Sequence, residues 1–202
     1  GEKYLSEMGR YPVIALSLKS MKQDTYKEAF HCLKEEIARE FKKHPEVAGS
    51  LALDDDREKY TRLMNRRADE EEYLTSLKFL SECLASFYGE KTVILVDEYD
   101  VPLENAYFRG FYDKMIVLIR SLFESAFKTN DTLEFAAVTG CLRISRESIF
   151  TGLNNLNIIS ITDSSYAEHF GFTQKEVDSI LKDYGLEENC QTVKAWYDGY
   201  QF

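Results

Sequence analysis

Two consecutive acids, Asp97 and Glu98, directly follow the apolar stretch T-V-I-L-V at residues 92–96. An unbroken run of this kind is typical of a strand buried on both faces of a parallel sheet. A buried carboxylate is costly unless it is paired or binds a metal, and ligands of open α/β sheets bind at the carboxyl ends of strands. We therefore expect Asp97 to hold Mg²⁺ and Glu98 to orient or deprotonate an attacking water.

The same two acids also fit a structural interpretation. Asp97 would then cap a following helix, and Glu98 would be solvated. Both residues follow the strand directly, so the local sequence leaves this choice open.

A second group of polar residues follows another predicted strand, L-E-F-A-A-V-T at residues 133–139. This strand ends in Thr139 and Gly140, and Arg143 comes three residues later. In a P-loop nucleotidase, the strand beside the acidic one carries polar groups that face the nucleotide. Thr139 would then contact the nucleotide, and Arg143 would sense its γ-phosphate.

The two arginines have alternative interpretations. Arg143 fits an ion pair with Asp97, Glu98 or Glu147 as well as it fits a phosphate contact. Arg146 is interpreted as an ordinary surface or pairing residue.

The elements that position these residues alternate between strands and helices. Apolar runs predict strands at 12–18, 92–97, 133–139 and 157–162. Apolar positions at helical spacing predict helices at 24–43, 74–87, 111–127, 173–184 and 193–197. Val101-Pro102-Leu103 is expected to interrupt regular structure. This order predicts an α/β domain with a mostly parallel, doubly wound sheet flanked by helices and a small helical C-terminal part.

Three consecutive acids, Asp54 to Asp56, suggest a calcium loop at first sight. The Gly and Glu that an EF-hand needs at fixed offsets are missing, so a solvated face is the expected interpretation.

Composition excludes several classes of protein. The net charge of -10 argues against a broad nucleic-acid surface, because phosphate binding needs clustered Lys and Arg. No apolar run approaches the ~20 residues that a membrane helix requires. No signal peptide is recognisable, and Cys32, Cys83, Cys141 and Cys190 form no metal or disulfide pattern. We expect a cytoplasmic protein with reduced thiols.

A phosphate-binding loop is missing from the sequence. None of the ten glycines is followed by Lys, so the chain contains no G-x-x-x-x-G-K-[ST] motif. In such folds the loop follows a strand that precedes the one at 12–18. We expect that strand and loop upstream of Gly1; the alternative is a site that has lost its loop.

Several longer motifs extend along nearly the whole chain: G-R-Y-P-V-I-A-L-S (9–17), V-I-L-V-D-E-Y-D-V-P (93–102), T-G-C-L-R-I (139–144), E-S-I-F-T-G-L-N-N (147–155), F-G-F-T (170–173) and W-Y-D-G-Y (196–200). In these motifs the chain resembles a bacterial AAA-ATPase-like family. The family is largely uncharacterised and often carries a nuclease-like domain after the ATPase part.

The resemblance implies a P-loop NTPase-like fold, with Asp97 and Glu98 as the acidic Walker B motif. It implies an ATPase-like core at 1–162, without its first strand and phosphate loop, and a helical segment of the same domain at 163–202. Mg²⁺ and ATP are the implied cofactors of the intact protein. A downstream nuclease-like domain or a second copy are the implied partners.

Two functions of different classes follow. The first is Mg-dependent ATP binding and hydrolysis in the intact protein, with this chain alone expected to be inactive. The second is a non-catalytic interaction or regulatory module, favoured by the missing loop and the aromatic-rich ends. Tyr107-Phe108 and Trp196-Tyr197 could form a partner surface, although packing is the expected interpretation for both pairs. A nuclease would need residues beyond Phe202.

Overall fold

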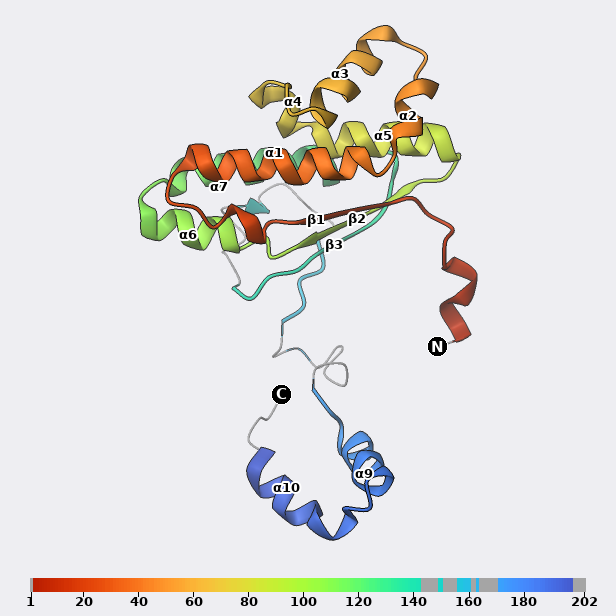
Figure 1. The fold of residues 1–202 in the computed structure, drawn as a ribbon, viewed down its shortest axis with the longest axis vertical. Coiled ribbons are helices and arrows are strands. Elements are labelled where there is room, and N and C mark those ends of the chain that lie inside the picture. The colour runs from red at the N-terminus through yellow and green to blue at the C-terminus, as the bar shows by residue number, and fades with distance from the viewer. Residues whose placement is uncertain (1, 143–148, 151–155, 161–162, 164–170, 198–202) are drawn as a thin grey trace. The chain divides into compact units, whose positions relative to one another are not determined.

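A computed structural model of the chain describes residues 2–142, 149–150, 156–160, 163 and 171–197 (Figure 1). The chain divides into two compact units, Gly1–Asn154 and Asn155–Phe202. No helix among the described residues combines the length and the apolar character needed to cross a bilayer.

The first unit is built on a sheet of three parallel strands. These are β1 (Val13–Ser17), β2 (Thr92–Asp97) and β3 (Leu133–Val138), in the spatial order β1-β2-β3. All three strands lie where the sequence predicts them. Parallel neighbours need crossover connections, and the helices between the strands provide them.

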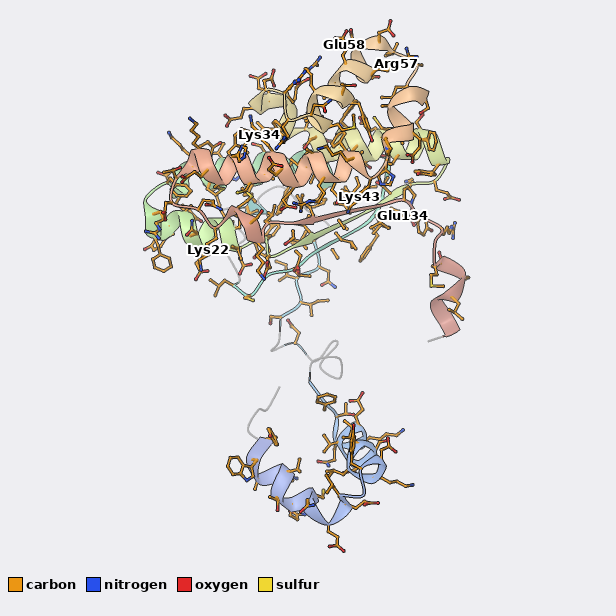
Figure 2. The ribbon with its side chains drawn as sticks, viewed as in Figure 1. Lys22, Lys34, Lys43, Arg57, Glu58 and Glu134 are labelled. Carbon is orange, nitrogen blue, oxygen red and sulfur yellow. The ribbon has the colours of Figure 1, made fainter. Side chains whose placement is uncertain are left out.

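Three long helices cover one face of this sheet (Figure 1). They are α1 (Tyr26–Lys42), α5 (Ser76–Tyr88) and α7 (Tyr112–Phe127), and their apolar stripes are buried. The shorter helices α2 (Pro45–Ser50), α3 (Asp54–Met64) and α4 (Glu70–Leu74) pack on the outside of this layer. Figure 2 shows Lys34 on α1, where its ammonium lies 5.1 Å from the centre of the Tyr73 ring of α4.

Local sequence signals set the helix ends. The Thr25 hydroxyl accepts a hydrogen bond from the Glu28 N–H, and the Glu28 carboxylate accepts one from the Thr25 N–H, which forms a capping box at the start of α1. Gly89 ends α5 with φ of 73°, in the left-handed region that glycine adopts without strain.

The other face of the sheet differs from the prediction. Side chains alternate along the strands, so that Ile14 and Ile94 are fully buried under the helices. Val13, Leu95 and Phe135 are 42%, 39% and 59% exposed. Burial on both faces is therefore wrong for the described part of the chain. An apolar run shows that a strand can be buried on two sides, but only the surrounding elements decide whether it is.

The outer edge of β1 is closed by a side chain. Glu40 of α1 is almost fully buried, and its carboxylate accepts a hydrogen bond of 3.0 Å from the Ala15 N–H. The same carboxylate pairs with Lys43, labelled in Figure 2. An unpaired strand N–H is thereby satisfied within the protein.

Two further predictions for the first unit are wrong. Val101-Pro102-Leu103 begins a helix, α6 (Val101–Arg109), because proline fits the first turn, where its missing N–H has no helical partner. Tyr107 and Phe108 on this helix are largely exposed rather than packed in the core. In contrast, Asp54 to Asp56 form the solvent-facing first turn of α3, as expected for a solvated acidic face.

The second unit contains α9 (Gln174–Asp183), a 3-10 turn at Glu187–Asn189 and α10 (Cys190–Tyr197). Thr173 and Glu176 form a capping box at the start of α9. The predicted strand at 157–162 is not formed over 157–160, and the last two residues lie outside the described residues. Four apolar or aromatic residues lie at helical spacing along α9 or at its end, and of these only Leu181 is buried, whereas Val177, Ile180 and Tyr184 are not. Trp196 and Tyr197 are exposed, contrary to the packing expected for them.

Candidate functional site

The carboxyl ends of the three strands meet at one edge of the sheet. Ser17 pairs in register with Asp97, and Val96 pairs with Val138. Beyond the strands, the Leu18 N–H donates to the Asp97 carbonyl at 3.0 Å, and the Thr139 N–H donates to the Val96 carbonyl at 2.8 Å. The parallel pairing therefore places the residue that follows β3 beside the last residue of β2.

Asp97 and Thr139 are brought into direct contact by this register. The Thr139 hydroxyl donates a hydrogen bond of 2.5 Å to Asp97 Oδ1. Both residues are exposed at the sheet edge. The helix-capping alternative for Asp97 is wrong, because the residue that precedes the first turn of α6 is Asp100.

Glu98 has an unusual backbone. Its φ is 55°, in the left-handed region that a residue with a Cβ adopts at a cost of ~1–2 kcal/mol. The side chain is half-buried, and the Glu98 carbonyl accepts a hydrogen bond of 3.2 Å from the Val101 N–H at the start of α6. Strained backbone of this kind is concentrated at functional sites, where the surrounding structure holds it in place.

Arg143, Arg146 and Glu147 lie outside the described residues. The phosphate-sensing role expected for Arg143 and its alternative ion pairs both remain predictions.

Two residues after the acidic pair join the site in a way the sequence reasoning missed. Asp100 Oδ2 accepts a hydrogen bond of 2.6 Å from the Leu142 N–H, and the Tyr99 hydroxyl donates one of 3.1 Å to the Leu142 carbonyl. Asp100 is only 3% exposed. The signal in the sequence is a third acid three residues after Asp97, directly before the segment 101–103 that is expected to interrupt regular structure.

The donor atoms at the strand ends suit a hard cation. Asp97, Glu98 and Thr139 offer oxygen ligands, which Mg²⁺ prefers, and Mg²⁺ commonly uses one or two carboxylates together with substrate phosphates. In the described part of the chain, no three His, Cys, Asp or Glu side chains are grouped to hold a metal by themselves. The residues present therefore fit a cation that is shared with a phosphate ligand.

Residues 1–150 match the sequence model of a family described as "Predicted AAA-ATPase". This match covers most of the 202-residue chain. The chain belongs to the predicted AAA-ATPase family. The family resemblance expected from the sequence motifs is thereby confirmed.

A relative from Azotobacter chroococcum mcd 1, described as "Uncharacterized protein in vnfD 5'region", is 37% identical to this family member over 118 residues. The aligned part covers 56% of this chain and 22% of the relative. The chain thus spans about a fifth of the length of the curated relative it matches. No solved structure matches the chain.

Proposed function

We propose that the intact protein binds and hydrolyses ATP in a Mg-dependent reaction at the carboxyl ends of β2 and β3. The contact between Asp97 and Thr139 is the observation that carries this proposal. The P-loop NTPase-like interpretation requires an acidic strand end beside a polar strand end. The contact between Asp97 and Thr139 supports this arrangement. Family membership supports the same conclusion at the level of the fold.

Each residue has a role that its chemistry allows. Asp97 would hold Mg²⁺, which when bound supplies positive charge that stabilises the phosphoryl oxygens. Thr139 orients the Asp97 carboxylate and presents its hydroxyl oxygen to the nucleotide. Glu98, which follows Asp97 directly and has a left-handed backbone, would take the proton of the attacking water. Arg143 would contact the γ-phosphate.

The phosphates need further donors. The 202 residues contain no G-x-x-x-x-G-K-[ST] motif, whose backbone N–H groups and Lys hold the phosphates in P-loop proteins. The test therefore uses the full-length protein, with this chain measured beside it.

Titration calorimetry with Mg-ATP, followed by a phosphate-release assay, tests the proposal. We expect Mg-dependent turnover in the full-length protein. Asp97→Ala should weaken binding and abolish turnover, while Glu98→Gln should retain binding and lower turnover at least ~100-fold. Absence of nucleotide binding by the full-length protein, or turnover unaffected by Glu98→Gln, contradicts the proposal.

A second candidate is a non-catalytic interaction module. The apolar sheet face formed by Val13, Leu95 and Phe135 favours it, because exposed apolar patches often mark protein interfaces. The same calorimetry separates the two functions, since a pure interaction module binds no Mg-ATP in any form of the protein.

We further propose that the protein acts in the cytoplasm. All four cysteines are free thiols, and one of them, Cys141, is exposed to solvent. Free exposed thiols are usual in a reducing compartment.

A further inference from the structure

We propose that Asp100 is a positioning residue: together with Tyr99 it holds the loop after β3 in register with the acidic pair. The loop is Gly140–Leu142, and we call its attachment to Tyr99 and Asp100 the Leu142 clamp. This inference rests on the proposed ATPase function and adds a residue to its site.

The clamp holds both backbone groups of one residue. The Leu142 N–H donates to Asp100 Oδ2 at 2.6 Å, and the Leu142 carbonyl accepts from the Tyr99 hydroxyl at 3.1 Å. A third contact joins the same two segments, because the Tyr99 N–H donates to the Thr139 carbonyl at 3.1 Å. These contacts fix the turn after β2 to the segment after β3 from Thr139 to Leu142, a length of four residues.

The approach of the two segments leaves no room for a side chain at position 140. A Cβ added to Gly140 would lie 2.6 Å from Asp100 Oδ1 and 2.7 Å from Tyr99 Cε1. Such distances are well below van der Waals contact, so the loop can rest against Tyr99 and Asp100 only with glycine at this position. The clamp therefore explains why a glycine follows Thr139.

The Asp100 carbonyl accepts hydrogen bonds from the Leu103 and Glu104 N–H groups, but the described residues give its side chain no partner besides Leu142. Asp100 is 3% exposed, and its Oδ1 has no hydrogen-bond partner among the described residues. Although Asp100 occupies the N-cap position of α6, its side chain makes no capping hydrogen bond. A buried carboxylate with one oxygen unsatisfied costs stability. We infer that this cost in stability is offset by the correct placement of the loop Gly140–Leu142.

The side chains of the loop are little buried by the described residues. Gly140 and Cys141 are exposed, and the Leu142 side chain is 47% exposed. The loop directly follows Thr139, whose hydroxyl contacts Asp97, and leads to Arg143. Loss of the clamp should therefore misplace the polar groups of this strand end relative to Asp97. A misplacement of about 1 Å can lower a catalytic rate about 100-fold.

The test compares Asp100→Ala, Asp100→Asn and Gly140→Ala in the full-length protein. Asp100→Ala removes the acceptor of the Leu142 N–H, Asp100→Asn keeps an acceptor oxygen without the charge, and Gly140→Ala pushes the loop away while leaving Asp100 intact. We expect Asp100→Ala and Gly140→Ala to lower kcat about 10- to 100-fold, with KM for Mg-ATP within about twofold of wild type. Asp100→Asn should keep kcat within about threefold.

Either of two results overturns the proposal. The first is an unchanged kcat in a folded Asp100→Ala or Gly140→Ala protein. The second is a kcat of Asp100→Asn as low as that of Asp100→Ala, because the charge and not the hydrogen bond would then be the required feature. If Asp100→Ala fails to fold, the kcat values of Gly140→Ala and Asp100→Asn still test the proposal.

Amide hydrogen exchange separates this inference from the proposed function. In this chain, exchange at the Leu142 amide should be slow in wild type and Asp100→Asn and at least about tenfold faster in Asp100→Ala. If the full-length wild type has no ATPase activity, the proposed function fails, and the exchange rates decide alone whether the clamp exists. Equal exchange rates in wild type and Asp100→Ala overturn the clamp.

Discussion

The Thr139 hydroxyl donates a 2.5 Å hydrogen bond to Asp97 Oδ1 at the carboxyl ends of two adjacent parallel strands. Asp97 lies 42 residues before Thr139 in the chain, and α6 and α7 separate them. The contact depends on the register of β2 against β3, so it links the geometry of the sheet directly to the chemistry of the candidate site.

Removal of this hydroxyl should affect activity more than stability. Thr139→Val keeps the shape of the side chain but loses the donor to Asp97. Because both residues are exposed, we expect the free energy of unfolding to change by less than ~0.5 kcal/mol. In the full-length protein, kcat/KM for Mg-ATP should fall about tenfold, which corresponds to ~1.4 kcal/mol. Thr139→Ser is the matched control, and equal losses in Ser and Val would contradict the role of the hydroxyl.

The left-handed backbone of Glu98 makes a prediction about stability that is independent of catalysis. Glu98→Gly should raise the free energy of unfolding by ~0.5–1 kcal/mol, because glycine adopts a φ of 55° without steric cost. Glu98→Ala keeps the Cβ and should give no such gain. Urea unfolding of this chain measures both variants, and a destabilised Glu98→Gly would show that the strain is absent.

One-sided burial of the sheet predicts different costs for two neighbours on β1. Ile14 is fully buried and Val13 is 42% exposed. Ile14→Ala should lower the free energy of unfolding by ~2–5 kcal/mol, since it leaves a cavity under α1. Val13→Ala should cost less than ~1 kcal/mol. Comparable losses for the two variants in this chain, measured by urea unfolding, would mean that the second face is covered in solution.

Cysteine reactivity should follow burial. Burial raises the pKa of the Cys83 thiol to about 12, so this thiol stays protonated and unreactive at pH 8. Cys141 is exposed and should react first with a disulfide reagent. Mass spectrometry of the labelled chain, with Cys141→Ser as control, checks this order. Labelling of Cys83 in the folded chain as fast as that of Cys141 would show that its site opens readily.

The same shift has a consequence for stability at high pH. The Cys83 pKa is raised in the folded state, so the folded chain holds its proton at a pH where the unfolded chain loses it. The contribution of the Cys83 thiol to the free energy of unfolding is complete below its unfolded pKa near 9.0, and it is lost as the pH rises toward the folded pKa of about 12. In Cys83→Ala this part of the pH dependence should be missing from unfolding measured between those values.

Much of the fold could be predicted from local patterns. The spacing of Phe30, Leu33, Ile37 and Phe41 defines α1, and Thr25 with Glu28 marks its start. The apolar runs ending at Ser17, Asp97 and Val138 correspond to the three strands. Such signals depend on residues a few positions apart, which is why they can be read without a structure.

Other predictions failed where local patterns were ambiguous. Pro102 predicts a break in regular structure but lies in the first turn of α6, since proline is compatible with both. The short apolar run at 157–160 predicts a strand but forms none, because β-propensity depends strongly on the surrounding structure.

The sequence by itself determined the α/β class, the three strands of the sheet, most helices and the two strand ends that carry Asp97, Glu98 and Thr139. Only the tertiary structure decided that the sheet is buried on one face, that Glu98 is held in a left-handed conformation and that Asp100 fastens the loop at Leu142. The physical reason is the range of the interactions. Periodicity and capping act within one element, whereas burial and the contacts of Asp97 and Asp100 depend on segments about forty residues apart that only the register of the sheet brings together.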